Sequence, residues 1–152
     1  MQEFIRRGCV LLLPLALLYC GGALAASVTL DVQAVAASDA GKDKEVSIPA
    51  TLDSYKTLLK QSGFKTFKDS GRQSVKAGEG EKATAQAGGY SLDLTVTKIE
   101  DGKCKVAVTI KDGDKPIGNP TSIPLAKGRP MQMQVGNADA PTILILNLRE
   151  TK

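Results

Sequence analysis

Three sulfur-bearing side chains are the residues of this sequence with the clearest capacity for chemistry. Met131 and Met133 are two positions apart, and Cys104 precedes them. Residues two apart share one face of a strand, and thiolate and thioether ligands select Cu(I). The same residues also fit core packing, because a free cysteine behaves as a small hydrophobe and the methionines alternate with glutamines before Val135. Core packing is the favoured interpretation, with Cu(I) binding as its alternative.

The aspartates offer a second possible chemistry. Asp112 and Asp114 flank Gly113, and Asp31 and Asp93 lie in segments with strand patterns. Paired carboxylates serve glycoside hydrolysis, and oxygen ligands bind Ca²⁺. However, Asp-Gly-Asp between two strands is typical of a turn, and the spacing of a calcium-binding loop is absent. We therefore assign no catalytic residue.

The sequence has no histidine. This excludes Ser-His-Asp and Cys-His catalysis and histidine-ligated zinc or haem. A glycine-rich phosphate loop is also missing, since Gly78-Glu79-Gly80 is not followed by the lysine and helix that such a loop needs. We expect no enzymatic activity and no cofactor.

The first 25 residues have the pattern of an export signal. Arg6 and Arg7 precede an apolar run from Val10 to Tyr19, and Ala23-Leu24-Ala25 is a small-x-small cleavage site. The apolar run is about half of the ~20 residues that a membrane span needs. We predict a cleaved secretory signal over 1–25 and a single periplasmic or extracellular domain over 26–152, without a transmembrane span. An uncleaved anchor and a lipid-modified Cys20 are the alternatives.

Cleavage removes two of the three cysteines, so Cys104 cannot form an internal disulfide. The remaining domain is rich in lysine, and Lys103, Lys105 and Lys111 share one face of a predicted strand. Such a strip can meet anionic lipid headgroups, polysaccharide or nucleic acid. Interleaved acidic residues and a net charge of only +3 for the remaining domain, with 18 Lys and Arg against 15 Asp and Glu, favour a solvated surface instead, and export argues against nucleic acid.

One segment has the period of a helix. Leu52, Tyr55, Leu58 and Leu59 form an apolar stripe over 51–62. Thr51 is a plausible N-cap residue, and Gly63 is placed to end the helix. A helix this short is marginal alone in water, so we expect it to pack against a sheet, either over its face or at its end.

Strand patterns cover most of the remaining chain. Residues 27–34 alternate between apolar and polar, and so do 90–99 and 103–111, which the hairpin signal Asp101-Gly102 joins. Thr142–Leu148 is apolar on both faces, which predicts a central strand covered on both sides.

Weaker patterns fill the gaps between these strands. Residues 82–87 are predicted as an edge strand, and 115–125 as an edge or broken strand because it holds three prolines. Asp69-Ser70-Gly71 is predicted as a turn between two strands, and 38–44 as a polar loop. The sum is an antiparallel β-sandwich of about eight strands with one helix, within the mainly β (α+β) class.

The order of these features resembles small exported β-rich proteins of unknown function from planctomycete and myxobacterial envelopes. The shared features are the alternating strand Val28–Ala34, the pattern L-x-x-Y-x-x-L-L over Leu52–Leu59, the string Gly63–Lys68 and the final apolar strand Thr142–Leu148. The resemblance implies an envelope protein and assigns no activity or site residue.

We therefore expect a non-catalytic exported protein that binds or supports an envelope or extracellular assembly. Free sheet edges pair readily with another chain, and the expected contacts are near 82–87 and 115–125. The alternative is a carrier of a small ligand or Cu(I), using the sandwich interior or Cys104, Met131 and Met133.

Overall fold

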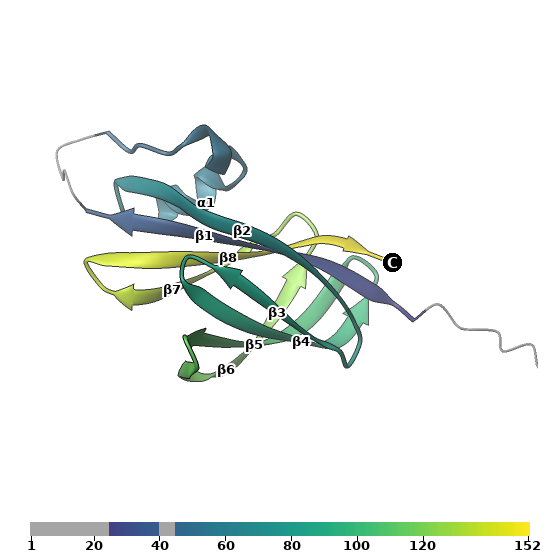
Figure 1. Ribbon diagram of the computed structural model, residues 1–152. Helices are drawn as coiled ribbons and strands as arrows, with labels where there is room; N and C mark the ends of the chain where they lie inside the picture. Colours follow the sequence, from purple (N-terminus) through teal and green to yellow (C-terminus); the bar gives the residue numbers. More distant parts are fainter. Residues whose placement is uncertain (1–24, 40–44) are drawn as a thin grey trace, which may run out of the picture.

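The protein is described by a computed structural model that covers residues 25–39 and 45–152. Its described part contains two antiparallel four-stranded sheets and one short helical segment (Figure 1). The predicted β-sandwich with one helix is therefore confirmed. The expected export signal, with Cys9 and Cys20, and most of the expected loop over 38–44 lie outside the described residues.

The eight strands are long relative to the turns that join them. They are β1 (Ser27–Ser38), β2 (Thr66–Gly78), β3 (Lys82–Ala87), β4 (Tyr90–Glu100), β5 (Lys103–Asp112), β6 (Lys115–Ala126), β7 (Met131–Asn137) and β8 (Ala140–Thr151). The hairpin of β4 and β5 around Asp101-Gly102 is confirmed, and Gly102 has the positive φ (69°) that such a turn requires.

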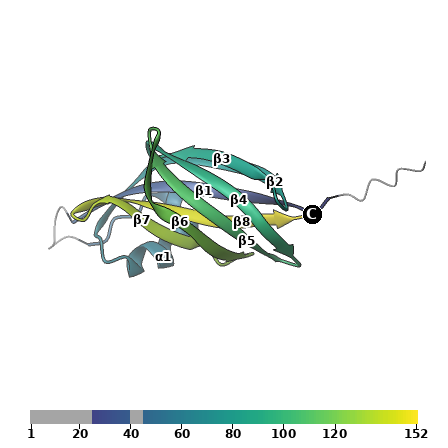
Figure 2. The ribbon, with the colours of Figure 1, turned by 90° about the horizontal axis from the view of Figure 1, so that it is seen from below.

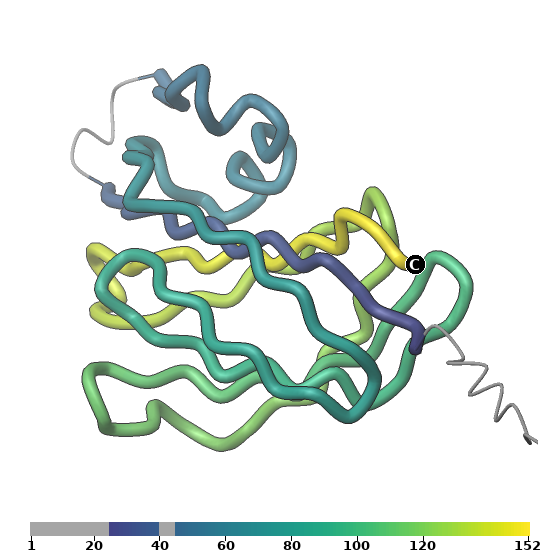
Figure 3. Tube along the Cα trace, turned by 45° about the vertical axis from the view of Figure 1, so that its right-hand side comes forward, coloured from purple at the N-terminus to yellow at the C-terminus, as the bar shows by residue number. Residues whose placement is uncertain are grey.

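The strands pair almost entirely in chain order. The order is β2-β1-β8-β7 in the first sheet, called sheet A, and β3-β4-β5-β6 in the second, called sheet B. Only the pair of β1 and β8 joins strands that are distant in the sequence, and Figure 3 shows the first and last strands side by side. Two hydrogen bonds between Ser27 and Lys152 tie the ends of this pair together.

The main core lies between the two sheets. Alternate residues of each strand point inward, as the period-two pattern predicts. Sheet A contributes Val28, Leu30 and Val32 from β1 and the even-numbered leucines of β8, which are Leu144, Leu146 and Leu148. Sheet B contributes the inward residues of β4, β5 and β6, among them Leu92, Leu94, Val106, Ile123 and Leu125.

The helical segment begins differently from the prediction. A 3₁₀ turn, η1 (Ala50–Tyr55), precedes the α-helix α1 (Lys56–Gln61). Pro49 occupies the N-cap position and no side chain caps the turn, so the prediction of Thr51 as N-cap is wrong. The fixed φ of proline starts the turn without a capping side chain. Gly63 follows the helix with a φ of +86°, as expected of a terminating residue.

A second core lies between this segment and the outer face of sheet A. Leu52 and Leu59 of the segment pack with Phe67 of β2 and with Ile143 and Ile145 of β8. The two-sided burial predicted for the last strand is confirmed. Figures 1 and 2 show the helical segment on one side of sheet A and sheet B on the other.

Strand β2 corrects the prediction of a turn at Asp69-Ser70-Gly71. The chain continues as one strand through a β-bulge, where its register with β1 shifts between Ala34 and Val35. The Gln33 side-chain amide donates to Asp69 Oδ1 (2.7 Å) and to the Gly71 carbonyl (3.1 Å), which holds the bulge in place. Gly71 has a φ of +127°. The prediction failed because the residue types that favour a turn, glycine above all, also occur at a β-bulge.

Replacing Gly88 with alanine should destabilise the protein far more than replacing Gly89. Both residues have positive φ (61° and 83°), so both variants carry about 1 kcal/mol of backbone strain. A Cβ at Gly88 would lie 2.7 Å from Ala34 Cβ of the opposite sheet, whereas one at Gly89 meets nothing within 4 Å. We expect G88A to lose about 3 kcal/mol and G89A about 1 kcal/mol in urea unfolding. Equal losses would contradict the close contact.

Candidate functional site

The structure brings Cys104 and Met131 to the lining of one pocket, described below, and places Met133 against the main core. Cys104 is buried in the main core, and burial raises the pKa of its thiol to about 11. It is therefore a neutral thiol at physiological pH and not a ready nucleophile. Met133 packs against the same core, while Met131 is 41% exposed at the start of β7. Within residues 25–39 and 45–152, no group of three or more Cys, Asp or Glu side chains is placed to hold a metal ion.

The candidate carboxylates do not come together. Asp31 lies on the outer face of sheet A and Asp93 on the outer face of sheet B, because their neighbours in β1 and β4 fill the core between the sheets. Asp112 and Asp114 are exposed around the β5–β6 turn at Gly113, as the turn interpretation predicts. These positions form no carboxylate pair for hydrolysis.

Asp31 is the buried member of a polar cluster on the face of sheet A that carries the helical segment, and its partners Arg72 and Ser74 are exposed. Its side chain is 2% exposed, its Oδ2 accepts from Arg72 Nη2 at 2.6 Å, and its Oδ1 accepts from the Ser74 hydroxyl. Burial raises the pKa of the neighbouring Tyr55 phenol, against the opposing influence of the Arg72 charge. The bonds of Asp31 tie β1 to β2. The sequence named Asp31, but nothing in it pointed to Arg72 as the partner.

Asp93 is held by two lysines on the outer face of sheet B. Lys111 Nζ lies 2.6 Å and Lys82 Nζ 3.1 Å from Asp93 Oδ2, and the Thr84 hydroxyl donates to Oδ1 at 3.0 Å. The bond from Lys111 is the main cause that lowers the pKa of this carboxyl to about 2. Asp93 thus joins β3, β4 and β5 and is already fully paired.

The four strands at the sheet edges differ in how they are protected. Natural proteins discourage strand addition with charges, prolines, bulges or short edges. Strand β2 has four charged residues and the bulge, and β6 has three prolines. Strand β3 is short, and its Gln86 backbone N–H donates to the side-chain oxygen of Gln73 in β2. Strand β7 has the sequence MQMQVGN, with no charge, no proline and no register shift against β8.

The sandwich is open along β6 and β7. Apart from their connecting turn, where Ala126 bridges to Arg129, the two strands do not pair. The large hydrophobic side chains that are exposed in the described part of the chain lie on these two strands, namely Ile117 on β6 and Met131 on β7. The segments predicted as contacts, 82–87 and 115–125, do form the two edges of sheet B.

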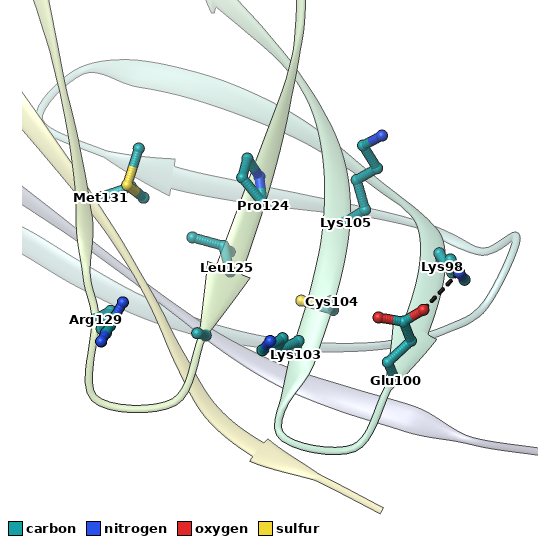
Figure 4. A pocket seen from close by; sticks show the side chains of 10 residues that line it. Lys98, Glu100, Lys103, Cys104, Lys105, Pro124, Leu125, Arg129 and Met131 are labelled. Atoms are coloured by element: carbon teal, nitrogen blue, oxygen red, sulfur yellow. Dashed lines mark ion pairs between the residues drawn. The ribbon is translucent and has the colours of Figure 1, made fainter.

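A pocket of about 480 Å³ lies where β4, β5 and β6 meet the start of β7 (Figure 4). Its apolar lining includes Pro124, Leu125 and Met131, and its charged lining consists of Lys98, Glu100, Lys103, Lys105 and Arg129. The sequence pattern indicates the lysines of β5 but not this pocket, because the pocket is formed by residues from four strands.

Comparison with protein families, with curated proteins and with solved structures finds no match for this chain. Among the described residues, no helix has the length and apolar composition needed to cross a bilayer. The candidate site therefore rests on the geometry of β7 and its adjoining pocket.

Replacing Arg72 with methionine should destabilise the protein by about 1–2 kcal/mol, because it leaves the buried Asp31 carboxylate without its counter-ion, while solvent around the half-exposed Arg72 side chain reduces the loss. The double variant D31N/R72M should recover most of this loss, since it removes the buried charge as well. Urea unfolding measures the free energy of unfolding of both variants. R149M, which replaces an exposed arginine, is the control. A double variant less stable than R72M would contradict this account.

Replacing Asp93 with asparagine should lower the free energy of unfolding by about 1 kcal/mol at pH 7, allowing for solvent around the two lysines. Folding lowers the pKa of Asp93 from 3.8 to about 2. Its stabilisation is therefore complete above pH 4 and is lost as the pH falls toward 2. Urea unfolding at pH 7 and pH 2 should show the difference from the unmodified protein shrink to a minor part of its value at pH 7, because the folded-state carboxyl is about half protonated at pH 2. D112N, at an exposed carboxylate, should show no such trend.

Proposed function

We propose that the protein is a non-catalytic binding module that acts as an accessory or structural subunit of an exported assembly, in the periplasm or outside the cell. The export pattern of residues 1–25 supports the location. The paired state of Asp31 and Asp93 and the neutral thiol of Cys104 support a role in binding rather than in catalysis.

The observation that carries the proposal is the unprotected edge of β7. Its seven residues include no charge, no proline and no register shift, and the backbone groups of alternate residues point away from β8, where no described strand pairs with them. Such an edge accepts an extended segment from another chain, with main-chain hydrogen bonds supplying affinity and side-chain pockets supplying specificity. The exposed Met131 gives the added strand an apolar contact at one end.

The sequence predicted contact with a partner through the sheet edges at 82–87 and 115–125, which are β3 and β6. The proposed contact is also at a sheet edge, but at β7. Prolines at 116, 120 and 124 remove backbone donors from β6, and β3 lies beside β2. Strand β7 has neither obstacle, so the partner segment pairs with β7 and extends sheet A.

A photo-crosslinking amino acid at Gln134 of β7 should capture one dominant partner in the native envelope, and the same group at Thr121 of β6 should capture much less. Both positions are exposed. The variant M131K/Q134K should reduce capture from a third exposed site at Asn137 by about tenfold, because lysines on an edge oppose strand addition. Mass spectrometry identifies the product.

The matched control is T121K/S122K, which adds the same charges to exposed positions of β6. It should leave capture from Asn137 unchanged. Equal capture from β6 and β7, or no effect of M131K/Q134K, would contradict the role of β7. Capture of a second copy of this chain would identify the assembly as an oligomer.

A further inference from the structure

We infer that the segment which pairs with β7 is acidic at the end next to Met131, and that its carboxylates bind Lys103, Lys105 and Arg129 in the adjoining pocket. This inference rests on the proposed function and specifies the chemistry of the partner. It is carried by the charge, the lining and the position of the pocket.

The charge of the pocket is unbalanced. Four cationic side chains line it, but Glu100 is its one carboxylate, and Glu100 is bound to Lys98 Nζ at 2.5 Å (Figure 4). Lys103, Lys105 and Arg129 form no ion pair within the described residues. This contrasts with Lys82 and Lys111 on the same sheet, which share Asp93. An anionic occupant would complete the pocket, and complementary charge directs both encounter and specificity.

The lining shows that the occupant also has an apolar part. Pro124, Leu125 and Met131 contribute apolar surface to the lining, and Figure 4 shows Arg129 and Met131 on the side of the pocket opposite Lys98 and Glu100. A free inorganic anion would leave this surface exposed. A peptide with an apolar side chain beside acidic ones would cover the surface and meet the charges together.

The position of the pocket connects it to strand addition. Met131 is both the first residue of β7 and part of the pocket lining. A strand laid along β7 therefore reaches the pocket at its Met131 end, and its next residues lie within reach of Arg129. The opposite end of β7, at Asn137, lies beyond the pocket lining. The acidic residues are thus expected at one end of the segment only.

The test is a selection of short random peptides, displayed on phage, against the exported protein obtained by expressing the full chain with a C-terminal tag. We expect the selected peptides to combine apolar residues with acidic residues clustered at one end. The charge-reversal variant K103E/K105E/R129E, at three exposed positions, should bind a selected synthetic peptide at least about tenfold more weakly. Increasing salt should weaken binding to the unmodified protein but not to this variant.

The matched control is K56E/K60E/K68E, which reverses three exposed lysines on the helical segment and β2. It changes the net charge equally and should change the affinity less than twofold. The neutral variant K103Q/K105Q/R129Q should weaken binding by an intermediate factor and keeps the test valid if the charge-reversal variant does not fold.

The outcomes separate this inference from the proposed function. Peptides that lose binding in M131K/Q134K but have no acidic excess and no response to K103E/K105E/R129E would overturn the acidic partner and leave strand addition intact. Acidic peptides whose binding is unchanged by Q134K/N137K, at two exposed positions of β7 outside the pocket lining, would overturn strand addition at β7. A selection that yields no specific peptide would overturn both.

Discussion

Burial of β8 on both of its faces is the constraint on which the rest of the structure depends. Its even-numbered leucines belong to the core between the sheets, and Ile143 and Ile145 belong to the core under the helical segment. Burying each such side chain stabilises the fold by about 1.5–3 kcal/mol relative to exposure. Sheet A therefore needs a layer on each face. The segment between β1 and β2, near the other end of the chain, supplies the outer layer.

Two-sided burial makes the polar residues of sheet A costly unless they are paired. Asp31 and Gln33 are each 2% exposed, and their partners are Arg72 and the Asp69–Gly71 bulge. Within residues 25–39 and 45–152 no helix lies over the outer face of sheet B, so its lysines stay in solvent. Asp93 neutralises part of this surface, while the end near Arg129 keeps an excess of positive charge. The outer face of sheet A is thus covered by the helical segment, and the outer face of sheet B is left to solvent. Binding is proposed at β7 and the adjoining pocket, which neither the helical segment nor sheet B covers.

Patterns of period two predict β1, β4 and β5, and the Asp101-Gly102 signal predicts the central hairpin, because these patterns depend on near neighbours. The bulge at Asp69–Gly71 was predicted as a turn, because aspartate and glycine favour both and only the Gln33 contact distinguishes them. The side on which the helix packs, the pairing of Asp31 with Arg72 and the pocket all depend on the long-range pairing of β1 with β8. For β7, the absence of charge and proline was visible in the sequence. It was interpreted as core packing, because a sequence does not show which strand ends at an edge.

The opening between β6 and β7 follows from the three prolines of β6, which also protect that strand from pairing with another chain. On the other side of the molecule, the β2–β3 turn is bonded to β4, where Gly80 N–H donates to the Val96 carbonyl (2.7 Å) and Val96 N–H to the Glu81 carbonyl (3.1 Å). An equivalent closure of β6 onto β7 would need backbone donors along β6, and three prolines remove some of them. The prolines therefore prevent β6 from pairing with β7 within the chain. They leave β7 with an unpaired side, and that side is the one proposed to receive the partner strand.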